Sequence, residues 1–473
     1  MTVSPNLARR RFLKLALGGA ALGLLGACAP AAAPTPTPAP AKPAEKPAEK
    51  PAQPTPTPAA QAKPAAPTGA KVITIWRGTD YSPLVNQGLR EFWTRYAQEA
   101  KVEINFEEKS GQWMDQLNAA VQAGTPPDIV AAFDYQVQYW RGQGQAIDVS
   151  DVVAKYKNAM GGLFDYVVAT VGWQGKFYGV PLAVNAWPFH VRQDLMDKHG
   201  FKWAQSWDEF RRQGKELTRA PQFYAYGYCL CKINDTNNHF LGTLWTFGGA
   251  LQKEDGSLGA SANDPAWLEA LRLTKVMYEE DKIIPPGAIN WTDADNNNAY
   301  QGEQIAWTSN PTSIYTWLEK NKPELAKATK FYPYPKGPAG SFGQVDVWSH
   351  IIFKASKVQE EAKGALEYVF KPENHAKYIE FVQGRFLPVY RELVDAPFWK
   401  KSEVYAEYAN IARNGRIMAH AASPTAPYAE ITTTFLIGEM MQDLLVRKQK
   451  PEEALATFVK RAQAIYDKYK GQL

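Results

Sequence analysis

The strongest constraint on the fold of this chain is an alternation of short apolar runs with longer segments of helical periodicity. Apolar runs at 71–76 and 129–133 predict buried strands, and residues 102–106 alternate like a half-buried strand. Segments with helical periodicity lie between them at 84–100 and 113–123. Strands that alternate with helices at this spacing form βα units, whose strands pair in a parallel sheet. The sequence therefore predicts an α/β fold.

Helices and strands continue downstream of these first units. Residues 172–181 predict a hairpin-like turn that leads into a crossing strand, and residues 207–218 predict a helix. Asp264 followed by Pro265 predicts the start of a helix that runs to about residue 281, because Asp is a favoured N-cap and Pro a favoured first helical residue. The last helix is predicted over 451–470.

The first 27 residues have the features of an export signal. Residues 9–14 read R-R-R-F-L-K, which fits the twin-arginine pattern R-R-x-F-L-K. The apolar run at 15–27 is too short for a spanning helix, which takes about 20 apolar residues. It ends in Leu25-Gly26-Ala27-Cys28, which resembles the lipobox of bacterial lipoproteins; the alternative is an ordinary signal with a chance cysteine. The resemblance implies lipid on Cys28, and a mature chain on the periplasmic or extracellular side of the cytoplasmic membrane.

Residues 28–70 comprise this cysteine and a Pro/Ala-rich spacer. From Ala29 to Thr68 the chain contains no aromatic and no branched aliphatic side chain. Such a stretch cannot bury enough apolar surface to offset its ordering entropy, so we expect it to be disordered. Its prolines favour an extended chain, which would let a folded domain work about 100 Å from the membrane.

The net charge of the folded part argues against a nucleic-acid partner. The whole chain has a formal charge of +5, but eight of its 53 Lys and Arg residues and two of its 48 Asp and Glu residues precede residue 69. The remaining chain therefore has a formal charge of −1. A nucleic-acid surface would need basic residues clustered on one face, which the sequence does not suggest.

Neither the cysteines nor the acidic runs predict a metal or a cofactor. Cys229 and Cys231 lie in a run that reads as strand, and two packed, reduced thiols are favoured there over a strained disulfide, although an exported location permits oxidation. No paired C-x-x-C supports the four ligands that zinc takes. Residues 293–298 are similar to a calcium loop but lack its central Gly and distal Glu, so they predict a helix start.

Several short motifs follow one another across the folded chain. They are Gly124-Thr125-Pro126-Pro127-Asp128-Ile129, Gly144 with Ile147-Asp148, Gly175-Lys176-Phe177-Tyr178-Gly179-Val180-Pro181, Ser206-Trp207-Asp208-Glu209-Phe210, Gly248-Gly249-Ala250 and Gly302-Glu303-Gln304-Ile305-Ala306-Trp307. In this order and spacing, the chain from Val72 to Lys470 resembles the extracellular solute-binding proteins of ABC importers, in the maltose-binding-like, carbohydrate-type group.

The resemblance implies a periplasmic-binding-protein-like fold of type II, with two α/β lobes, hinge strands and a ligand cleft between the lobes. The expected first lobe comprises residues 71–183 and 335–372, and the second lobe residues 184–334 and 373–473. Ligand binding is expected to close the lobes, and the closed form to dock on a membrane permease. The resemblance implies a monomeric carrier that is not an enzyme and needs no cofactor.

The topology of open α/β sheets selects candidate binding residues without the family. Ligands meet the loops just past the carboxyl ends of the strands. The residues in these places are Trp76, Arg77, Thr79, Asp80, Asp134 and Tyr135. Asn185 and Trp187 lie in the predicted crossing strand, the region that faces both lobes in the similar maltose-binding protein.

A second set of candidates lies next to turns and motifs. It consists of Trp245, Trp307, Asn310, Trp348 and Arg385. Trp faces stack on the C–H faces of a sugar, while Asp, Asn and Arg bond its hydroxyls. The alternative for each of these Trp residues is a place in the core, for Asp80 and Asp134 a helix N-cap, and for Arg385 a salt bridge between the lobes. His350, at the end of a predicted turn with Trp348, is interpreted as structural.

Three functions compete at this stage. The first is a carrier of a sugar, oligosaccharide or polyol for an ABC importer. The second is an exported carbohydrate-active enzyme, which would need two carboxyl groups about 5–10 Å apart; Glu107, Glu108, Asp134 and Glu430 are available, but no motif selects them. The third keeps the fold but changes the ligand, for example to a glycerol phosphate, a polyamine or iron. A polyamine site needs clustered acids and an iron site needs paired Tyr, and the predicted cleft shows neither clearly, whereas Arg77 and Arg385 fit an anionic ligand.

Overall fold

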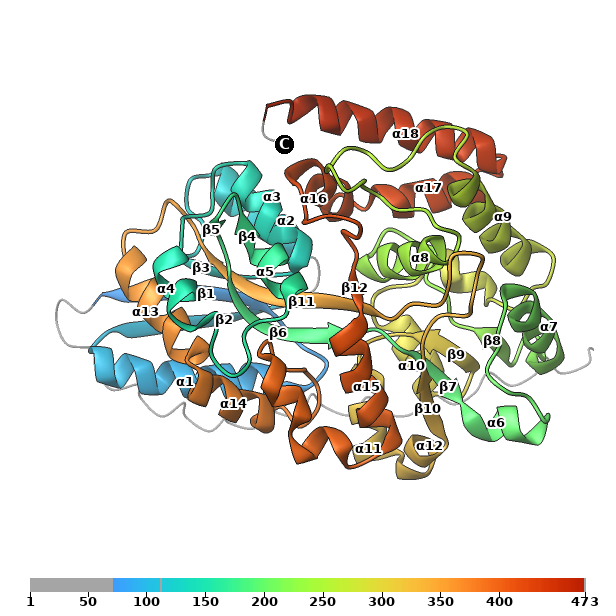
Figure 1. The fold of residues 1–473 in the computed structure, drawn as a ribbon, viewed down its shortest axis with the longest axis horizontal. Helices are drawn as coiled ribbons and strands as arrows, with labels where there is room; N and C mark the ends of the chain where they lie inside the picture. The colour runs from blue at the N-terminus through green and yellow to red at the C-terminus, as the bar shows by residue number, and fades with distance from the viewer. Residues whose placement is uncertain (1–70, 111–112, 472–473) are drawn as a thin grey trace, which may run out of the picture. The chain divides into compact units, whose positions relative to one another are not determined.

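The computed structural model describes residues 71–110 and 113–471. The expected export signal, Cys28 and the spacer lie outside the described residues. Helices and strands alternate along the described chain, which confirms the mixed α/β class (Figure 1). Among the helices of these residues, none has the length and apolar character needed to cross a membrane.

The first sheet is built from strands of both halves of the chain. Its strands are β1 (Val72–Gly78), β2 (Glu103–Lys109), β3 (Ile129–Ala132), β6 (Val180–Ala186), β11 (Gln344–Ile352) and β12 (Arg416–Ile417). They lie in the order β12-β11-β3-β1-β2, with β6 also paired to β11. The three strands predicted before residue 134 are confirmed, and β1 runs parallel to both β2 and β3. By contrast, β11 is antiparallel to β3 and β6.

Helices from two separate stretches of sequence pack on the first sheet. They are α1 (Pro83–Ala100), α2 (Trp113–Gln122), α3 (Asp134–Gly142), α4 (Ser150–Tyr156), α5 (Asp165–Val171), α13 (Gln359–Phe370) and α14 (Pro372–Phe381). Helix α1 buries Val85, Leu89 and Phe92 at the spacing of one helical face. Its Trp93 donates a hydrogen bond to the Ala365 carbonyl on α13 (3.1 Å), which ties the two stretches together.

The second sheet has an aromatic core. Its strands lie in the order β10 (Thr329–Tyr332), β7 (Phe189–Arg192), β9 (Ile305–Ser309) and β8 (Tyr224–Tyr226). The associated helices are α6 (Gln193–Lys198), α7 (Trp207–Leu217), α8 (Asn234–Thr246), α9 (Pro265–Glu279), α10 (Asp295–Gln301), α11 (Ser313–Asn321), α12 (Pro323–Lys327), α16 (Ala426–Thr433), α17 (Leu436–Leu445) and α18 (Pro451–Lys468). Phe189, Phe210 and Trp307 are fully buried among them.

Two strands lead directly from one sheet toward the other. Only Trp187 and Pro188 separate β6 from β7, and residues 333–343 join β10 to β11. Figure 1 shows β6 and β11 side by side where they leave the first sheet. Helix α15 (Glu403–Asn414) contacts β10 of the second sheet and β6 and β11 of the first. The two sheets are thus linked by paired strands rather than by a single connection.

The packing bears on the lobe boundaries expected from the sequence. All of β6 pairs within the first sheet, although residues 184–186 were expected in the second lobe. Helix α14 packs against α1 and α13, although residues 373–381 were also expected in the second lobe. The register with β11 and the apolar contacts of α14 favour placing both with the first sheet.

Several local predictions are confirmed and two need correction. The 172–181 turn is a hairpin, β4 (Gly172–Trp173) with β5 (Lys176–Phe177), and Asp264 caps α9 through its side chain. Strand β8 ends at Tyr226, so the strand expected at Cys229 and Cys231 is wrong; the backbone N–H of Cys229 is instead held by His239 (3.1 Å). Both thiols are free and buried, as expected.

The second correction concerns the turn expected around Trp348 and His350. Both residues lie inside β11 rather than at the end of a turn. The reason is that β11 pairs on both sides along these positions, with β6 at Trp348 and with β3 at His350. His350 is buried and packs edge-on against Trp93, with ring centroids 5.5 Å apart.

We predict that Gly438→Ala destabilises the protein. A Cβ atom at this position of α17 would lie 2.5 Å from the Cys231 carbonyl oxygen and 2.8 Å from the Lys232 Cα atom, both backbone atoms that cannot turn aside. Overpacking of this kind costs about 1–3 kcal/mol, more than the gain in helix propensity. Urea denaturation measures the change. Gly287→Ala, whose Cβ would meet only Trp291 at 3.7 Å, is the control; equal stability of Gly438→Ala and the wild type would contradict the packing.

Candidate ligand-binding site

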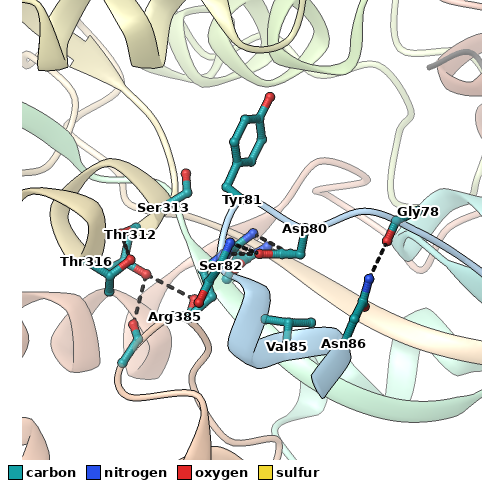
Figure 2. Close-up of polar contacts among 12 residues, drawn as sticks. Gly78, Asp80, Tyr81, Ser82, Val85, Asn86, Thr312, Ser313, Thr316 and Arg385 are labelled. Carbon is teal, nitrogen blue, oxygen red and sulfur yellow. Dashed lines mark hydrogen bonds and ion pairs between the residues drawn. The ribbon is translucent and has the colours of Figure 1, made fainter. Parts of the chain in front are cut away.

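Four residues predicted from the sequence meet in one hydrogen-bonded network. The Arg385 guanidinium donates to both carboxylate oxygens of Asp80, from Nε (2.9 Å) and Nη2 (3.0 Å), and to the Asn185 amide oxygen from Nη1 (2.8 Å). Figure 2 shows the Asp80–Arg385 contact at the start of α1. Asn185 in turn donates to Asp346 Oδ1 (3.1 Å), and Trp187 Nε1 donates to Asp346 Oδ2 (2.5 Å).

The fold explains why these residues meet. Asp80 follows the carboxyl end of β1, Asn185 is next to the last residue of β6, and Arg385 follows α14. Asn185 and Asp346 are direct cross-strand partners in the β6–β11 pair, which brings their side chains together. The network therefore joins the edge of the first sheet to the strand that leads into the second.

Burial makes the pairing of Arg385 necessary. Arg385 is 4% exposed, and a guanidinium so deep requires a charged partner. Burial is the largest single effect and opposes its charge, but the attraction and hydrogen bonds of Asp80, with the attraction of Tyr408 and Asp346, together raise the pKa of Arg385. The two parallel bonds to one carboxylate are the strongest geometry available to this pair. Arg385 also contributes a backbone carbonyl, together with that of Gly384, that accepts from the Thr312 hydroxyl of the second-sheet half (Figure 2).

Asp346 is a member of this network that sequence reasoning missed. Burial raises the pKa of Asp346 to about 6, while the bonds from Trp187 and Asn185 and the attraction of Arg385 act in the opposite direction. Sequence reasoning predicted a turn near Trp348 and so did not select Asp346. Only the β6–β11 register shows that position 346 faces Asn185.

Arg77 and Trp348 form a second group beside the network. The Arg77 guanidinium carbon lies 4.6 Å from the centre of the Trp348 ring, a cation–π contact, and its Nε donates to Asn86 Oδ1 (3.0 Å). Phe133 also packs against Trp348, with the two ring centroids 4.0 Å apart. The terminal nitrogens of Arg77 and Nε1 of Trp348 are buried without a hydrogen-bond partner among the described residues.

Asp134 and Tyr135 begin α3 and form a third group. Asp134 Oδ1 accepts from the Tyr135 backbone N–H (2.8 Å), whereas its Oδ2 is buried without a partner in the described part of the chain. Burial, followed by repulsion from Asp346, raises the pKa of Asp134 well above its usual value. The same helix packs on α16 of the second-sheet half so closely that a Cβ on Gly142 would lie 2.4 Å from that of Ala426.

The second-sheet half presents a polar segment that sequence reasoning also missed. Residues 235–239 at the start of α8 are all buried although each is polar. Asp235 accepts from Asn296 (3.0 Å), and Asn238 accepts from the side chain of Gln344 on β11. The six polar residues at 234–239 that open a mainly apolar helix are a signal that could have been used. Tyr81, which points away from Asp80 in Figure 2, donates to Asp293 Oδ2 (2.7 Å) in the same half.

The remaining predicted residues lie apart from the network. Trp76 faces the opposite side of β1 from Arg77, where Lys109 Nζ lies 3.7 Å from its ring centre. Trp307 is in the aromatic core, 4.5 Å from Phe210. Trp245 is buried in α8, and its ring centroid lies 6.1 Å from that of His420. Asn310 donates to Asn297 in the second-sheet half.

The acidic segment near residue 293 begins a helix, as expected. Asp295 is the first residue of α10, and its carboxylate accepts from the Thr292 backbone N–H (2.6 Å). Among the described residues, no group of three or more His, Cys, Asp or Glu side chains is placed to hold a metal ion.

Comparison with known proteins assigns the family. A family model of the bacterial extracellular solute-binding proteins matches residues 81–376, more than half of the chain. The chain belongs to this family, and it is therefore an exported protein. A putative binding protein of Brucella abortus (strain 2308) is 27% identical over 299 residues, which cover 62% of this chain and 69% of that protein.

Solved structures of the same fold are more distant in sequence. An ABC transporter solute-binding protein of Thermotoga lettingae TMO, bound with α-D-tagatose, matches with a TM-score of 0.71 at 20% identity over 84% of this chain and 100% of that chain. The maltose-bound MalE3 of T. maritima matches with a TM-score of 0.73 at 19% identity over 84% of this chain and 100% of that chain. The expected periplasmic-binding-protein-like fold of type II is confirmed.

We predict that Asp346 makes the protein less stable as the pH rises from about 4 to about 6. The pKa of its carboxyl is raised to about 6 in the folded state, so the folded protein holds a proton there that the unfolded chain releases. The difference in unfolding free energy between wild type and Asp346→Asn should fall by about 2 kcal/mol between pH 4 and pH 7.

Urea denaturation of both proteins across this pH range measures the effect. Trp187→Phe removes a hydrogen bond that lowers the pKa of Asp346 in the folded state, so the upper limit of this pH window should rise in that variant while its lower limit stays. Parallel pH profiles for the wild type and Asp346→Asn would contradict the prediction.

Proposed function

We propose that this chain captures a sugar, oligosaccharide or polyol between its two sheets and delivers it to the permease of an ABC importer. The observation on which this rests most is the meeting of buried polar and aromatic side chains where β1, β3, β6 and β11 face the second-sheet half. Membership of the solute-binding family and the sugars bound by the two similar structures support the ligand class.

The chemistry of the unpartnered atoms supports a polyhydroxyl ligand. Asp134 Oδ2 and Asn237 Oδ1 are buried acceptors, whereas Trp348 Nε1 is a buried donor, and all three are without partners among the described residues. A hydroxyl group both donates and accepts, so a sugar ring can serve both kinds of atom. Phe133, Tyr135 and Trp348 add the flat faces on which sugar C–H groups stack.

The two sheets and their helices would act as the lobes of the carrier. We propose a first lobe that extends the expected residues 71–183 and 335–372 to include all of β6 and α14, with most of the rest in the second lobe. The strands that link the sheets would be the hinges. The contacts of Tyr81 with Asp293 and of α3 with α16 join the lobes, which fits a closed form. We further propose that the carrier is a monomer held to the membrane by lipid on Cys28.

The carboxylates available for hydrolysis support a carrier rather than an enzyme. Glu107 is paired with Lys109 (2.6 Å), Glu108 with Arg90 (2.8 Å) and Glu430 with Lys468 (2.6 Å). Glycoside hydrolysis needs one free general acid and one free base or nucleophile. Of the four, only Asp134 has a buried oxygen without a partner among the described residues, which favours a carrier over an enzyme.

We predict that maltose, D-tagatose or another compound in a panel of sugars and polyols raises the melting temperature of the full chain, because a ligand that binds only the folded state stabilises it. Asp134→Ala should weaken binding of that compound about tenfold or more, since a buried acceptor is lost. Trp76→Phe, on the opposite face of β1, should bind like the wild type.

Thermal shift and isothermal titration calorimetry measure these effects. Two results would contradict the proposal: a panel in which no sugar or polyol shifts the melting temperature, or release of a hydrolysis product from any oligosaccharide. Circular dichroism of Asp134→Ala checks that a loss of binding is not a loss of fold.

We predict that Cys28→Ser abolishes lipid attachment when the full chain is expressed in a bacterium with twin-arginine export. The thiol is the atom that would receive the diacylglycerol, so the variant should lose palmitate labelling and pass from the detergent phase to the aqueous phase. Cys229→Ser, which alters a buried free thiol of the folded part, is the matched control and should keep the label. Labelling of the Cys28→Ser protein would show that the anchor lies elsewhere.

A further inference from the structure

Four carboxylates from both halves of the molecule act electrostatically on Tyr135. Asp134 and Asp346 belong to the first-sheet half, and Asp235 and Asp293 to the second. Burial raises the pKa of the Tyr135 phenol well above its usual value, and each of the four carboxylates raises it further. Contacts bring these elements together: Phe133 packs on both Tyr135 (ring centroids 5.8 Å apart) and Trp348 of β11 (4.0 Å), and Asn238 of α8 accepts a hydrogen bond from Gln344 of β11. Asp134, Asp235 and Asp346 are buried, with exposed fractions of 0%, 4% and 1%.

Arg385 attracts Asp346, but no cation among the described residues is paired with the other three carboxylates. Among the described residues, none of the four carboxylates takes part in a salt bridge, although ion pairs are numerous elsewhere in the described chain. The two buried arginines have other principal partners. Arg385 is bound to Asp80, and the charged partners that act on Arg77 are Asp80, Arg385 and Glu108.

An independent observation shows that hydrogen-bond donors are missing here. Asp134 Oδ2, Asn234 Oδ1 and Asn237 Oδ1 are acceptors buried without a partner in the described part of the chain. Asp134 and Asn237 are themselves fully buried. The hydroxyl of Tyr428 on α16 is also unpartnered and fully buried, and it lies within electrostatic reach of Asp134 and Tyr135. Side chains from α3, α8 and α16 thus leave polar atoms unpaired in one region.

Electrostatics limits what completes such a region. A carboxylate removed from water without a counter-charge is strongly disfavoured, so it takes up a proton or pairs with a cation. Asp235 and Asp293 of the second-sheet half add further negative charge to this region when the two halves approach. A neutral sugar would supply hydroxyl donors but would leave the negative charge uncompensated. An anionic ligand would add to it.

We propose that the ligand of this site has a protonated amine in addition to its hydroxyl groups, as in an amino sugar or an amino polyol. The ammonium group would lie against Tyr135, between Asp134 and Asp346 on one side and Asp235 on the other. Its three N–H donors match the unpaired acceptors, and its charge compensates the carboxylates. The Tyr135 ring also offers a face for a cation. This inference rests on the proposed capture of a polyhydroxyl ligand and narrows its class.

The test compares ligands that differ only in the amine. Isothermal titration calorimetry of the full chain at pH 7 would use D-glucosamine with D-glucose, D-galactosamine with D-galactose, and 1-amino-1-deoxy-D-sorbitol with D-sorbitol. In at least one pair, the amine should bind ten times more tightly than its neutral partner, and this preference should shrink at high salt.

Asp134→Asn provides the matched variant, because it removes one charge and keeps the shape of the side chain. It should reduce the preference for the amine about tenfold while affinity for the neutral partner changes less. Asp208→Asn, whose carboxylate is 94% exposed, is the control and should behave like the wild type. Circular dichroism and thermal melts confirm that both variants are folded.

The outcomes separate this inference from the proposed function. Equal or tighter binding of the neutral partner would overturn the inference and leave the carrier of sugars or polyols standing. Tighter binding of glucose 6-phosphate, or stabilisation by calcium chloride alone, would also overturn it. Absence of binding for every amine and every neutral sugar or polyol would contradict the proposed function, and the inference with it.

Discussion

The buried ion pair between Asp80 and Arg385 is the interaction on which the rest of the structure depends. Two charges taken out of water repay their desolvation only when geometry is good and the remaining donors are satisfied. Arg385 meets both conditions, because two of its nitrogens bind Asp80 and a third binds Asn185. The pair fixes the loop after β1 to the segment after α14 and to β6. Since β6 leads into the second sheet through Trp187, this ion pair helps to set the position of one sheet relative to the other.

The charge distribution divides the site into two unlike parts. Around Arg385 and Arg77, the charges are balanced by Asp80 and Glu108. The guanidinium nitrogens of Arg385 all have hydrogen-bond partners within the protein. Around Tyr135, carboxylates gather without a salt bridge among the described residues, and several acceptors are unpaired. The first part has what is needed to hold the sheets together. The second part has what is needed to bind something from solution, and it is completed only when residues of α8 and α16 approach α3.

The sequence predicted the site residues that follow strand ends and missed those that distant pairing brings in, for a physical reason. Asp80 and Asp134 follow the carboxyl ends of parallel strands, and such loops meet at one edge of a sheet whatever the distant chain does. Asp346 could not be found this way, because its place depends on the β6–β11 register, and Asp235 because it depends on how α8 approaches the first sheet. Trp307 shows the opposite limit: an aromatic residue beside a motif gives no sign of whether it faces a ligand or, as here, the core.

A double-mutant cycle on Asp80 and Arg385 tests the central claim most directly. Unfolding free energies would be measured for Asp80→Ala, Arg385→Ala and the double variant. Because either single change leaves a buried charge unpaired, each should cost about 3–5 kcal/mol, and the double variant should cost at least about 2 kcal/mol less than their sum. Costs that add to within about 0.5 kcal/mol would show that the two side chains act independently, and would contradict the account.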